Sequence, residues 1–270
     1  MYVVSKIVLE VIPPLELVWI RYLIAFATLF VCGLATRASW RIERRDIGLI
    51  LAIGVIGYAI SVTTQFFGTK LSSAQMGAVI TSATPAFMVV FARFLLKEKV
   101  TWQKALSVIL ATIGVLLIVG GGDLGWSNPL GGVVLIVAAF TWALMSVLVK
   151  RVPSHYPQLV VTTYAILIAA VVMTPIAAGQ IQNIDWDQLL QPTVLLGVLY
   201  LGTVSTAGAF FLWNKGLQLV DAGSGGLYFF FQPLVGTLLG WLILGEQVGI
   251  LFWIGSALIL AGVLFVVKET

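Results

Sequence analysis

The sequence predicts an all-α membrane protein, a ten-helix bundle whose first helix is truncated and which is built from two inverted five-helix repeats. Three observations support this class: an apolar composition, a series of apolar runs of bilayer-spanning length, and an internal repeat. Of the 270 residues, 60% are hydrophobic and 10% are charged, and the mean hydropathy is +1.07. Soluble domains carry about 25% charged residues, so an ordinary soluble domain is excluded.

The elements follow from the length of helix that crosses a hydrocarbon core, roughly 20 residues for about 30 Å. In chain order the predicted spans are Leu15–Ala35, Ile47–Gly68, Ala74–Leu96, Trp102–Gly120, Leu130–Lys150, Gln158–Ala178, Pro192–Trp213, Gly223–Leu244 and Gly249–Val267. Before them, Met1–Ile12 reaches only about 18 Å as a helix, which is too short to span. We therefore expect the other half of the first helix to lie upstream of this start; the alternative is that Met1–Ile12 lies along the membrane interface. The alternating polarity of barrel strands is absent from the sequence, so the spans are predicted to be helices.

Basic residues mark one side of the membrane. Taking alternate loops, one side carries Arg37, Arg41, Arg44, Arg45, Lys97, Lys99, Lys104, Lys150, Arg151, Lys215 and Lys268. The opposite loops carry Lys70 together with several acidic residues. Because Lys and Arg are retained in cytoplasmic loops, this bias predicts a multi-pass protein whose basic loops and C-terminus are cytoplasmic.

An internal repeat appears when the chain is shifted by 148 residues. The shift places Pro85 on Pro233, Glu98 on Glu246, and Gly114-Val115-Leu116 on Gly262-Val263-Leu264. Glu98 falls in a predicted cytoplasmic loop and Glu246 in an outward one, so the repeats, residues 1–120 and 130–268, are predicted to have opposite orientations. Inverted repeats place a substrate site near the middle of the bilayer, between the two halves, and allow them to alternate access.

These residues resemble a known family. The opening stretch Tyr2–Glu10, with Pro13–Leu17 and Arg21–Ala25, is similar to the start of EamA-type permeases of the drug/metabolite transporter superfamily. Leu96-Lys-Glu98 and Leu244-Gly-Glu246 are similar to the glutamates that end helices in that family. The resemblance implies ten helices in two inverted repeats. It also implies a location in the bacterial cytoplasmic (inner) membrane and the movement of metabolites or the export of amino acids and drugs.

Enzyme chemistry is not predicted. The one histidine of the sequence, His155, lies in a basic loop, so neither a bilayer Ser-His pair nor a zinc site can be assembled around it. The sequence has no Gly-x-x-x-x-Gly-Lys-[Ser/Thr] loop for ATP phosphates and no nucleic-acid motif. We therefore expect no cofactor, no metal and no nucleic acid; the expected partners are the lipid bilayer and a small-molecule solute, and a homodimer is compatible with the sequence.

Charged groups inside a membrane are the first candidates for function, because burying them in lipid is costly. Lys6 and Arg21 fall on either side of the outward Pro13-Pro14 turn, with Glu10 and Glu16 nearby as expected countercharges. They are interpreted either as anion-binding groups in the outer half of the pathway or as members of a structural ion pair. No carboxylate falls in the middle third of a predicted span, so ion coupling is predicted to run through Lys6 or to be absent, as in a facilitator or exchanger.

Neutral side chains complete the candidate pathway. The substrate-pathway candidates are Lys6, Arg21, Tyr58, Gln65, Thr81, Thr84, Trp142, Trp213, Asn214, Tyr228 and Gln232; the helix-kink candidates are Pro85 and Pro233; the helix-end or gate candidates are Glu98 and Glu246. Hydroxyl and amide groups also serve as contacts between membrane helices, so each admits a structural interpretation. The leading hypothesis is a secondary transporter of small organic solutes. The alternative is a non-transporting membrane protein that binds a partner or lipid.

Overall fold

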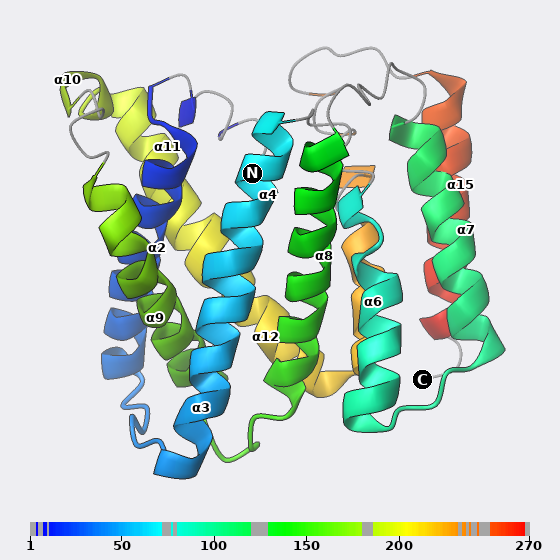
Figure 1. Ribbon diagram of the computed structural model, residues 1–270, viewed down its shortest axis with the longest axis horizontal. Helices are drawn as coiled ribbons and strands as arrows, with labels where there is room; N and C mark the ends of the chain where they lie inside the picture. Colours follow the sequence, from blue (N-terminus) through cyan, green and yellow to red (C-terminus); the bar gives the residue numbers. More distant parts are fainter. Residues whose placement is uncertain are drawn as a thin grey trace. The chain divides into compact units, whose positions relative to one another are not determined.

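The structure is a computed structural model, shown in Figure 1. It describes residues 4, 8–9, 11–71, 77, 80–119, 129–179, 186–231, 234–235, 238, 242 and 249–267. Every regular element within these residues is a helix, which confirms the predicted all-α class.

Several membrane-length helices change their hydrogen-bonding pattern along their course. The helices are α2 (Pro14–Ala35), α3 (Arg44–Ala52), η1 (Ile53–Ser61), α4 (Val62–Leu71), α6 (Thr84–Phe91), η2 (Ala92–Leu96), α7 (Trp102–Val119), α8 (Pro129–Lys150), α9 (Gln158–Ala178), α10 (Trp186–Leu189), α11 (Pro192–Gly202), η4 (Thr203–Gly208), α12 (Ala209–Leu219), α13 (Ala222–Leu227), η5 (Tyr228–Phe230) and α15 (Ile250–Val267). Segments η1, η2 and η4 are π-helical, and η5 is a 3₁₀ turn.

Five helices in the described part of the chain are long and apolar enough to cross a membrane. They are Pro14–Ala35, Arg44–Gly68, Pro129–Lys150, Gln158–Ala178 and Pro192–Leu219. Three shorter apolar helices, Thr84–Leu96, Trp102–Leu117 and Ile250–Phe265, fall within other predicted spans. The protein is therefore a multi-pass membrane protein.

One predicted helix end differs from the end observed in the structure. The span expected to end at Trp213 continues as helix to Leu219. Lys215 and Gln218 end the apolar window, yet both are good helix formers, and a lysine at a helix end can extend its stem toward water. The consequence is that Trp213 and Asn214 lie inside a helix rather than at its end.

The helices form two compact units, each of which takes segments from both halves of the sequence. Unit 1 contains residues 1–63 and 148–218, and unit 2 contains residues 64–147 and 219–270. A hydrophobic cluster in unit 1 joins Leu17 of α2 to Val194, Val198 and Leu201 of α11. In unit 2, another joins Ala111 and Val115 of α7 to Ile259 and Val263 of α15 and to Leu227 and Phe230.

The repeat is visible in the helix pair of unit 2. Helices α7 and α15 start at Trp102 and Ile250 and end at Val119 and Val267, so a shift of 148 residues superposes both bounds. They pack side by side (Figure 1). A Cβ at Gly114 would lie 2.5 Å from the carbonyl oxygen of Gly255, and one at Gly262 would lie 2.9 Å from that of Ser107. Later residues of one helix thus meet earlier residues of the other, and the equivalent helices run antiparallel.

Unit 1 contains a second pair of equivalent helices with the same relation. Near one end of α2, Trp19 Nε1 donates a hydrogen bond to Thr174 Oγ1 of α9 over 3.1 Å. Near the other end, a Cβ at Gly33 would lie 3.1 Å from the Leu159 side chain. Helices α2 and α9 are therefore also antiparallel, as the inverted repeat predicts.

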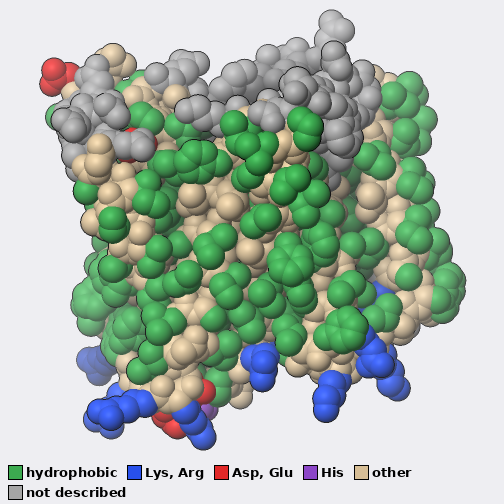
Figure 2. Space-filling model, in the orientation of Figure 1, with side chains coloured by type: hydrophobic (Ala, Val, Ile, Leu, Met, Phe, Trp, Pro, Cys, Tyr) green, Lys and Arg blue, Asp and Glu red, His purple; other side chains and the backbone are tan. Residues whose placement is uncertain are grey.

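The surface is apolar over most of each helix. In Figure 2, hydrophobic side chains cover most of the visible helices, and Lys and Arg side chains lie beside the start of α3, at the lower left. The connections α2–α3 and α8–α9 meet at this end of unit 1, where Tyr156 contacts Glu43 and Asp46. Arg37, Arg41, Arg44, Arg45 and Arg151 belong to these connections or lie at the helix ends beside them.

Candidate functional site

Two π-helical segments lie at matching positions in unit 1. Helix Arg44–Leu71 contains η1 and helix Pro192–Leu219 contains η4, and a shift of 148 residues superposes the bounds of the two helices. A π-segment carries an extra residue per turn and is frequent at functional sites. In η4, the Thr206 hydroxyl donates to the carbonyl oxygen of Leu201, five residues earlier, over 2.7 Å. Tyr58 is the residue of η1 that matches Thr206 under the same shift.

Arg21 is held against Thr206. Its Nε and Nη2 donate to Thr206 Oγ1 over 3.1 and 2.9 Å, and Arg21 is only 5% exposed. Among the described residues no carboxylate forms an ion pair with Arg21. A buried charge without a counterion in a membrane protein costs about 3 kcal/mol even on the mildest scales, so Arg21 is a candidate functional group.

A chain of buried hydrogen bonds lies beside this contact. Tyr22, the neighbour of Arg21, donates from its hydroxyl to the carbonyl oxygen of Tyr58 over 2.9 Å. Asn214 Nδ2 donates to the Tyr58 hydroxyl over 2.8 Å and to Thr162 Oγ1 over 2.9 Å. Tyr58, Thr162 and Asn214 have no exposed surface. Since α2, α9, η1 and α12 each contribute a member, the chain connects four elements of unit 1.

We call Arg21, Tyr22, Tyr58, Thr162, Thr206 and Asn214 the polar cluster of unit 1. Among the described residues, Asn214 Oδ1 is buried without a hydrogen-bond donor. The Tyr58 ring stacks on Phe210 with centroids 4.7 Å apart, which fixes its orientation. The cluster thus combines a cationic fork of donors with an unfilled acceptor, a set suited to a small solute that bears both acidic and donor groups.

Glu16 departs from its expected role as a countercharge to Arg21. Both carboxylate oxygens are buried, and neither has a hydrogen-bond partner among the described residues. The two residues are five apart on α2, and at about 100° per residue they point roughly 140° apart around the helix. Glu16 therefore cannot face Arg21 from the same helix. Lys6 and Glu10 lie outside the described residues.

The other predicted pathway residues are placed individually. Trp213 of α12 is half-buried in unit 1, whereas Gln65, Thr81, Thr84, Trp142 and Tyr228 belong to unit 2. Thr84 is 1% exposed, Thr81 donates to the carbonyl oxygen of Gly77 over 2.7 Å, and Tyr228 is 44% exposed. The rings of Trp142 and Phe229 lie 6.2 Å apart. Gln232, Pro233 and Glu246 lie outside the described residues.

Pro85 stands at a break in its span. It occupies the first turn of α6, directly after a turn at Ser82–Ala83. This position suits proline, because the first turn leaves its backbone N–H groups without intrahelical partners. The predicted span is therefore interrupted by the turn at Ser82–Ala83, and α6 starts directly after it at Thr84.

Glu98 holds the start of another helix in unit 2. Its two carboxylate oxygens accept hydrogen bonds from the backbone N–H groups of Ala222 and Gly223 over 2.9 and 3.1 Å, at the first residues of α13. Beside it, Lys104 Nζ lies 3.4 Å from Asp221 Oδ2, and the Lys104 side chain is 8% exposed. These contacts tie the end of η2 to the start of α7 and of α13.

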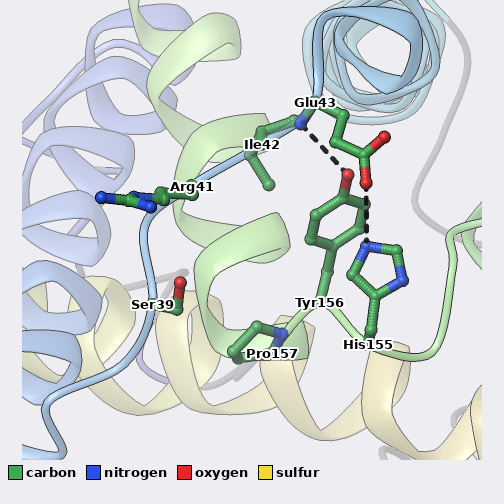
Figure 3. A pocket seen from close by; sticks show the side chains of 7 residues that line it. All are labelled: Ser39, Arg41, Ile42, Glu43, His155, Tyr156 and Pro157. Atoms are coloured by element: carbon green, nitrogen blue, oxygen red, sulfur yellow. Dashed lines mark hydrogen bonds and ion pairs between the residues drawn. The ribbon is translucent and has the colours of Figure 1, made fainter.

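A pocket opens at the basic end of unit 1 (Figure 3). Its volume is about 550 Å³, and its lining consists of Ser39, Arg41, Ile42, Glu43, His155, Tyr156 and Pro157. Tyr156 and His155 point toward Glu43 (Figure 3), whose backbone N–H donates to the Tyr156 hydroxyl over 3.1 Å. The same hydroxyl donates to Asp46 Oδ2 over 2.8 Å. Burial, together with the negative charge of Asp46, raises the pKa of the Tyr156 phenol, so it stays a neutral donor at physiological pH.

The sequence named Arg21, Tyr58 and Asn214 as candidates, but it did not single out Tyr22, Thr162 or the loop pocket. Tyr22 directly follows Arg21, and Thr162 lies one turn into α9, so a search for polar groups beside a buried charge would have found the first. Within the described chain, no group of three or more His, Cys, Asp and Glu residues is placed to hold a metal ion.

Comparison with known proteins identifies the family of the chain. The EamA-like transporter family matches residues 1–120 and 129–268. The uncharacterized transporter YetK of Bacillus subtilis is 27% identical over 268 residues, covering 97% of this chain and 80% of that protein. An uncharacterized transporter of Archaeoglobus fulgidus is 24% identical and covers 95% of this chain and 89% of its own length.

The chain is also similar to a shorter curated protein and to a solved crystal structure. The permease-like protein YdzE of Bacillus subtilis is 75% identical over 71 residues, which are 26% of this chain and 91% of that protein. A protein crystal structure superposes with a TM-score of 0.84 at 20% identity, covering 99% of this chain and 91% of the other. The chain belongs to the EamA-like transporter family and is a multi-pass membrane transporter.

Proposed function

We propose that the protein is a secondary transporter of small organic solutes that carry a carboxylate, such as metabolites or amino acids. The observation that carries this proposal is the buried Arg21, whose guanidinium has a hydroxyl partner and, among the described residues, no counterion. Thr206 accepts from two of its five N–H groups. The remaining donors form the planar fork that suits a carboxylate oxygen pair.

The polar cluster also supports the preference for amino-acid-like solutes. The unfilled acceptor Asn214 Oδ1 is neutral and buried, so it would accept a hydrogen bond from a solute ammonium or hydroxyl group. A solute that satisfied both Arg21 and Asn214 would relieve two unfavourable burials at once. A purely apolar solute would relieve neither.

The route is proposed to open by alternating access between the two inverted repeats. The antiparallel packing of equivalent helices and the matched π-segments support this mode, because repeat-related elements can exchange conformations between the two faces of the membrane. We further propose that the basic end of unit 1 and the C-terminus face the cytoplasm of a bacterial cell.

The test is solute counterflow into proteoliposomes that contain the purified full chain. A panel of amino acids, their decarboxylated amines and non-amino carboxylic acids separates the contribution of each group. In Arg21→Gln we expect the exchange of carboxylate-bearing solutes to fall at least about tenfold, because a charge-assisted pair is lost. Arg93→Gln is the matched control, since Arg93 is exposed at the end of η2 and should leave exchange unchanged.

Two results would count against the proposal. Equal losses in Arg21→Gln and Arg93→Gln would show that total charge rather than the cluster matters. Equal exchange of an amino acid and its decarboxylated amine would remove the carboxylate from the recognised chemistry.

A further inference from the structure

We propose that Tyr22 is a positioning residue for transport, which links solute recognition at Arg21 to the π-segment η1. The proposal rests on the proposed function, because it needs Arg21 to bind the solute. It gives Tyr22 the transmission of that binding rather than contact with the solute. The starting observation is an adjacency in α2: Arg21 and Tyr22 are consecutive residues, and each bonds to a different π-segment of unit 1.

The two bonds reach equivalent positions of the repeat. Arg21 donates to the Thr206 hydroxyl in η4, and Tyr22 donates over 2.9 Å to the backbone carbonyl oxygen of Tyr58 in η1. Thr206 and Tyr58 are related by the shift of 148 residues. Consecutive side chains of an α-helix point about 100° apart, so α2 can bond to one π-segment from each of two faces. One turn of α2 therefore connects the two repeat-equivalent helices of unit 1.

The π-segments are the places where these two helices can bend. A helix kinks readily at a π-segment, because its backbone hydrogen bonds depart there from the regular α pattern. Segments η1 and η4 lie inside two helices of membrane-spanning length, Arg44–Gly68 and Pro192–Leu219. The proposed alternation of access moves repeat-related elements, so we expect these helices to bend at η1 and η4. A side chain that bonds to a π-segment then affects how that helix bends.

Solute binding acts on the bond between Arg21 and Thr206. The Thr206 hydroxyl accepts from Arg21 and donates to the Leu201 carbonyl oxygen over 2.7 Å. A solute carboxylate competes with this hydroxyl for the guanidinium and is the stronger acceptor, because its hydrogen bonds are charge-assisted. As Arg21 turns toward the solute, the turn of α2 that carries it moves, and the Tyr22 hydroxyl transmits the movement to η1. Tyr22 is 2% exposed and Tyr58 has no exposed surface, so bulk water does not compete for their bond.

The test is counterflow into proteoliposomes that contain the full chain, together with equilibrium binding of the same probe. The probe is the radiolabelled carboxylate-bearing solute that the parent protein exchanges fastest in the panel above. In Tyr22→Phe the maximal exchange rate should fall about fivefold, the effect of one buried hydrogen bond, while the dissociation constant changes less than about twofold. A solute contact would instead weaken binding, and a general structural defect would lower rate and affinity together.

Tyr164→Phe is the matched control. The Tyr164 hydroxyl also donates to a backbone carbonyl oxygen, that of Trp40, over 3.1 Å, but Trp40 lies in neither π-segment. This variant should leave rate and affinity unchanged. Amide hydrogen exchange gives a second readout: it should rise within Ile53–Ser61 in Tyr22→Phe and not in Tyr164→Phe, because only the first variant removes the bond between α2 and η1.

Four results would overturn the role of Tyr22: an unchanged exchange rate in Tyr22→Phe, equal slowing in Tyr164→Phe, a parallel loss of rate and affinity, or unchanged amide exchange in η1. Arg21→Gln, measured in the same assay, separates this inference from the proposed function. If Arg21→Gln slows exchange and Tyr22→Phe does not, the proposed function stands and the role of Tyr22 is refuted. If Arg21→Gln leaves exchange unchanged, the proposed function is refuted and this inference with it.

Discussion

The close approach between the repeat-equivalent helices α7 and α15 should be sensitive to a single methyl group. In Gly114→Ala, the new Cβ would lie 2.5 Å from the Gly255 carbonyl oxygen and 2.9 Å from Ile259 Cγ1. The first of these neighbours is backbone and cannot rotate away, so α7 and α15 must separate locally. Overpacking of this kind costs about 1–3 kcal/mol, and the better helix propensity of alanine returns up to about 1 kcal/mol. We expect a net destabilisation of about 1–2 kcal/mol.

Two other glycines of the chain provide reference values for the destabilisation expected in Gly114→Ala. At Gly262, the repeat-equivalent position, the nearest atom is 2.9 Å away, so Gly262→Ala should cost less than Gly114→Ala. Gly216 in α12 has no atom within 4 Å of the point where an added Cβ would lie, so there only the propensity gain remains. Gly216→Ala should therefore be neutral or stabilising by up to about 1 kcal/mol.

The assay is thermal unfolding of the three purified variants in one detergent, followed by circular dichroism. The expected order of midpoints is Gly216→Ala at or above the parent, then Gly262→Ala, then Gly114→Ala. If Gly114→Ala unfolded at the parent temperature, or if all three fell together, the close antiparallel contact of α7 and α15 would be refuted.

Three further predictions concern the other contacts. A double-mutant cycle of Tyr58→Phe and Asn214→Leu should give a coupling energy of about 0.6–1.7 kcal/mol in detergent unfolding, and additivity would contradict their hydrogen bond. Glu98→Ala should lower stability by about 1–2 kcal/mol through loss of the N-terminal contacts of α13, while Lys99→Ala next to it should have little effect; equal shifts would argue against those contacts. In a Cys32→Ser background, Ser39→Cys should react with an impermeant maleimide only from the cytoplasmic side and Gln191→Cys only from outside, in right-side-out and inverted vesicles; the reverse pattern would overturn the proposed orientation.

Much of the fold follows from the sequence because the relevant physics is local. A lipid-facing helix must be apolar over its length, so a hydropathy window locates spans such as Gln158–Ala178 at the observed bounds. The shift of 148 residues relates Trp102 to Ile250 and Val119 to Val267. In the structure the first pair of residues starts the two helices and the second pair ends them. The window fails at Trp213, because it reports where apolar residues stop and not where backbone hydrogen bonding stops.

The contacts of the candidate site are less predictable, because they depend on rotation about helix axes. The sequence identifies Arg21 and Asn214 as polar groups in apolar surroundings, yet it does not show that Thr206 and Thr162 are their partners. The π-segments change the rotation per residue within two helices. A period of 3.6 residues therefore does not predict which residues share a face along the full length of either helix. Glu16 shows the same difficulty within α2, where proximity in sequence placed it beside Arg21 and rotation separates them.

The ion pair of Lys104 with Asp221 has a consequence for how the duplicated halves diverged. Moved by one repeat, these positions become Phe252 and Ser73, which cannot form an ion pair. The two copies therefore use different chemistry at these equivalent positions, and the Lys104–Asp221 contact responds to ionic strength where its counterpart cannot. Added salt around Asp221 would weaken this contact without a matching effect at Phe252 and Ser73, so the two repeats differ in how they respond to ionic strength.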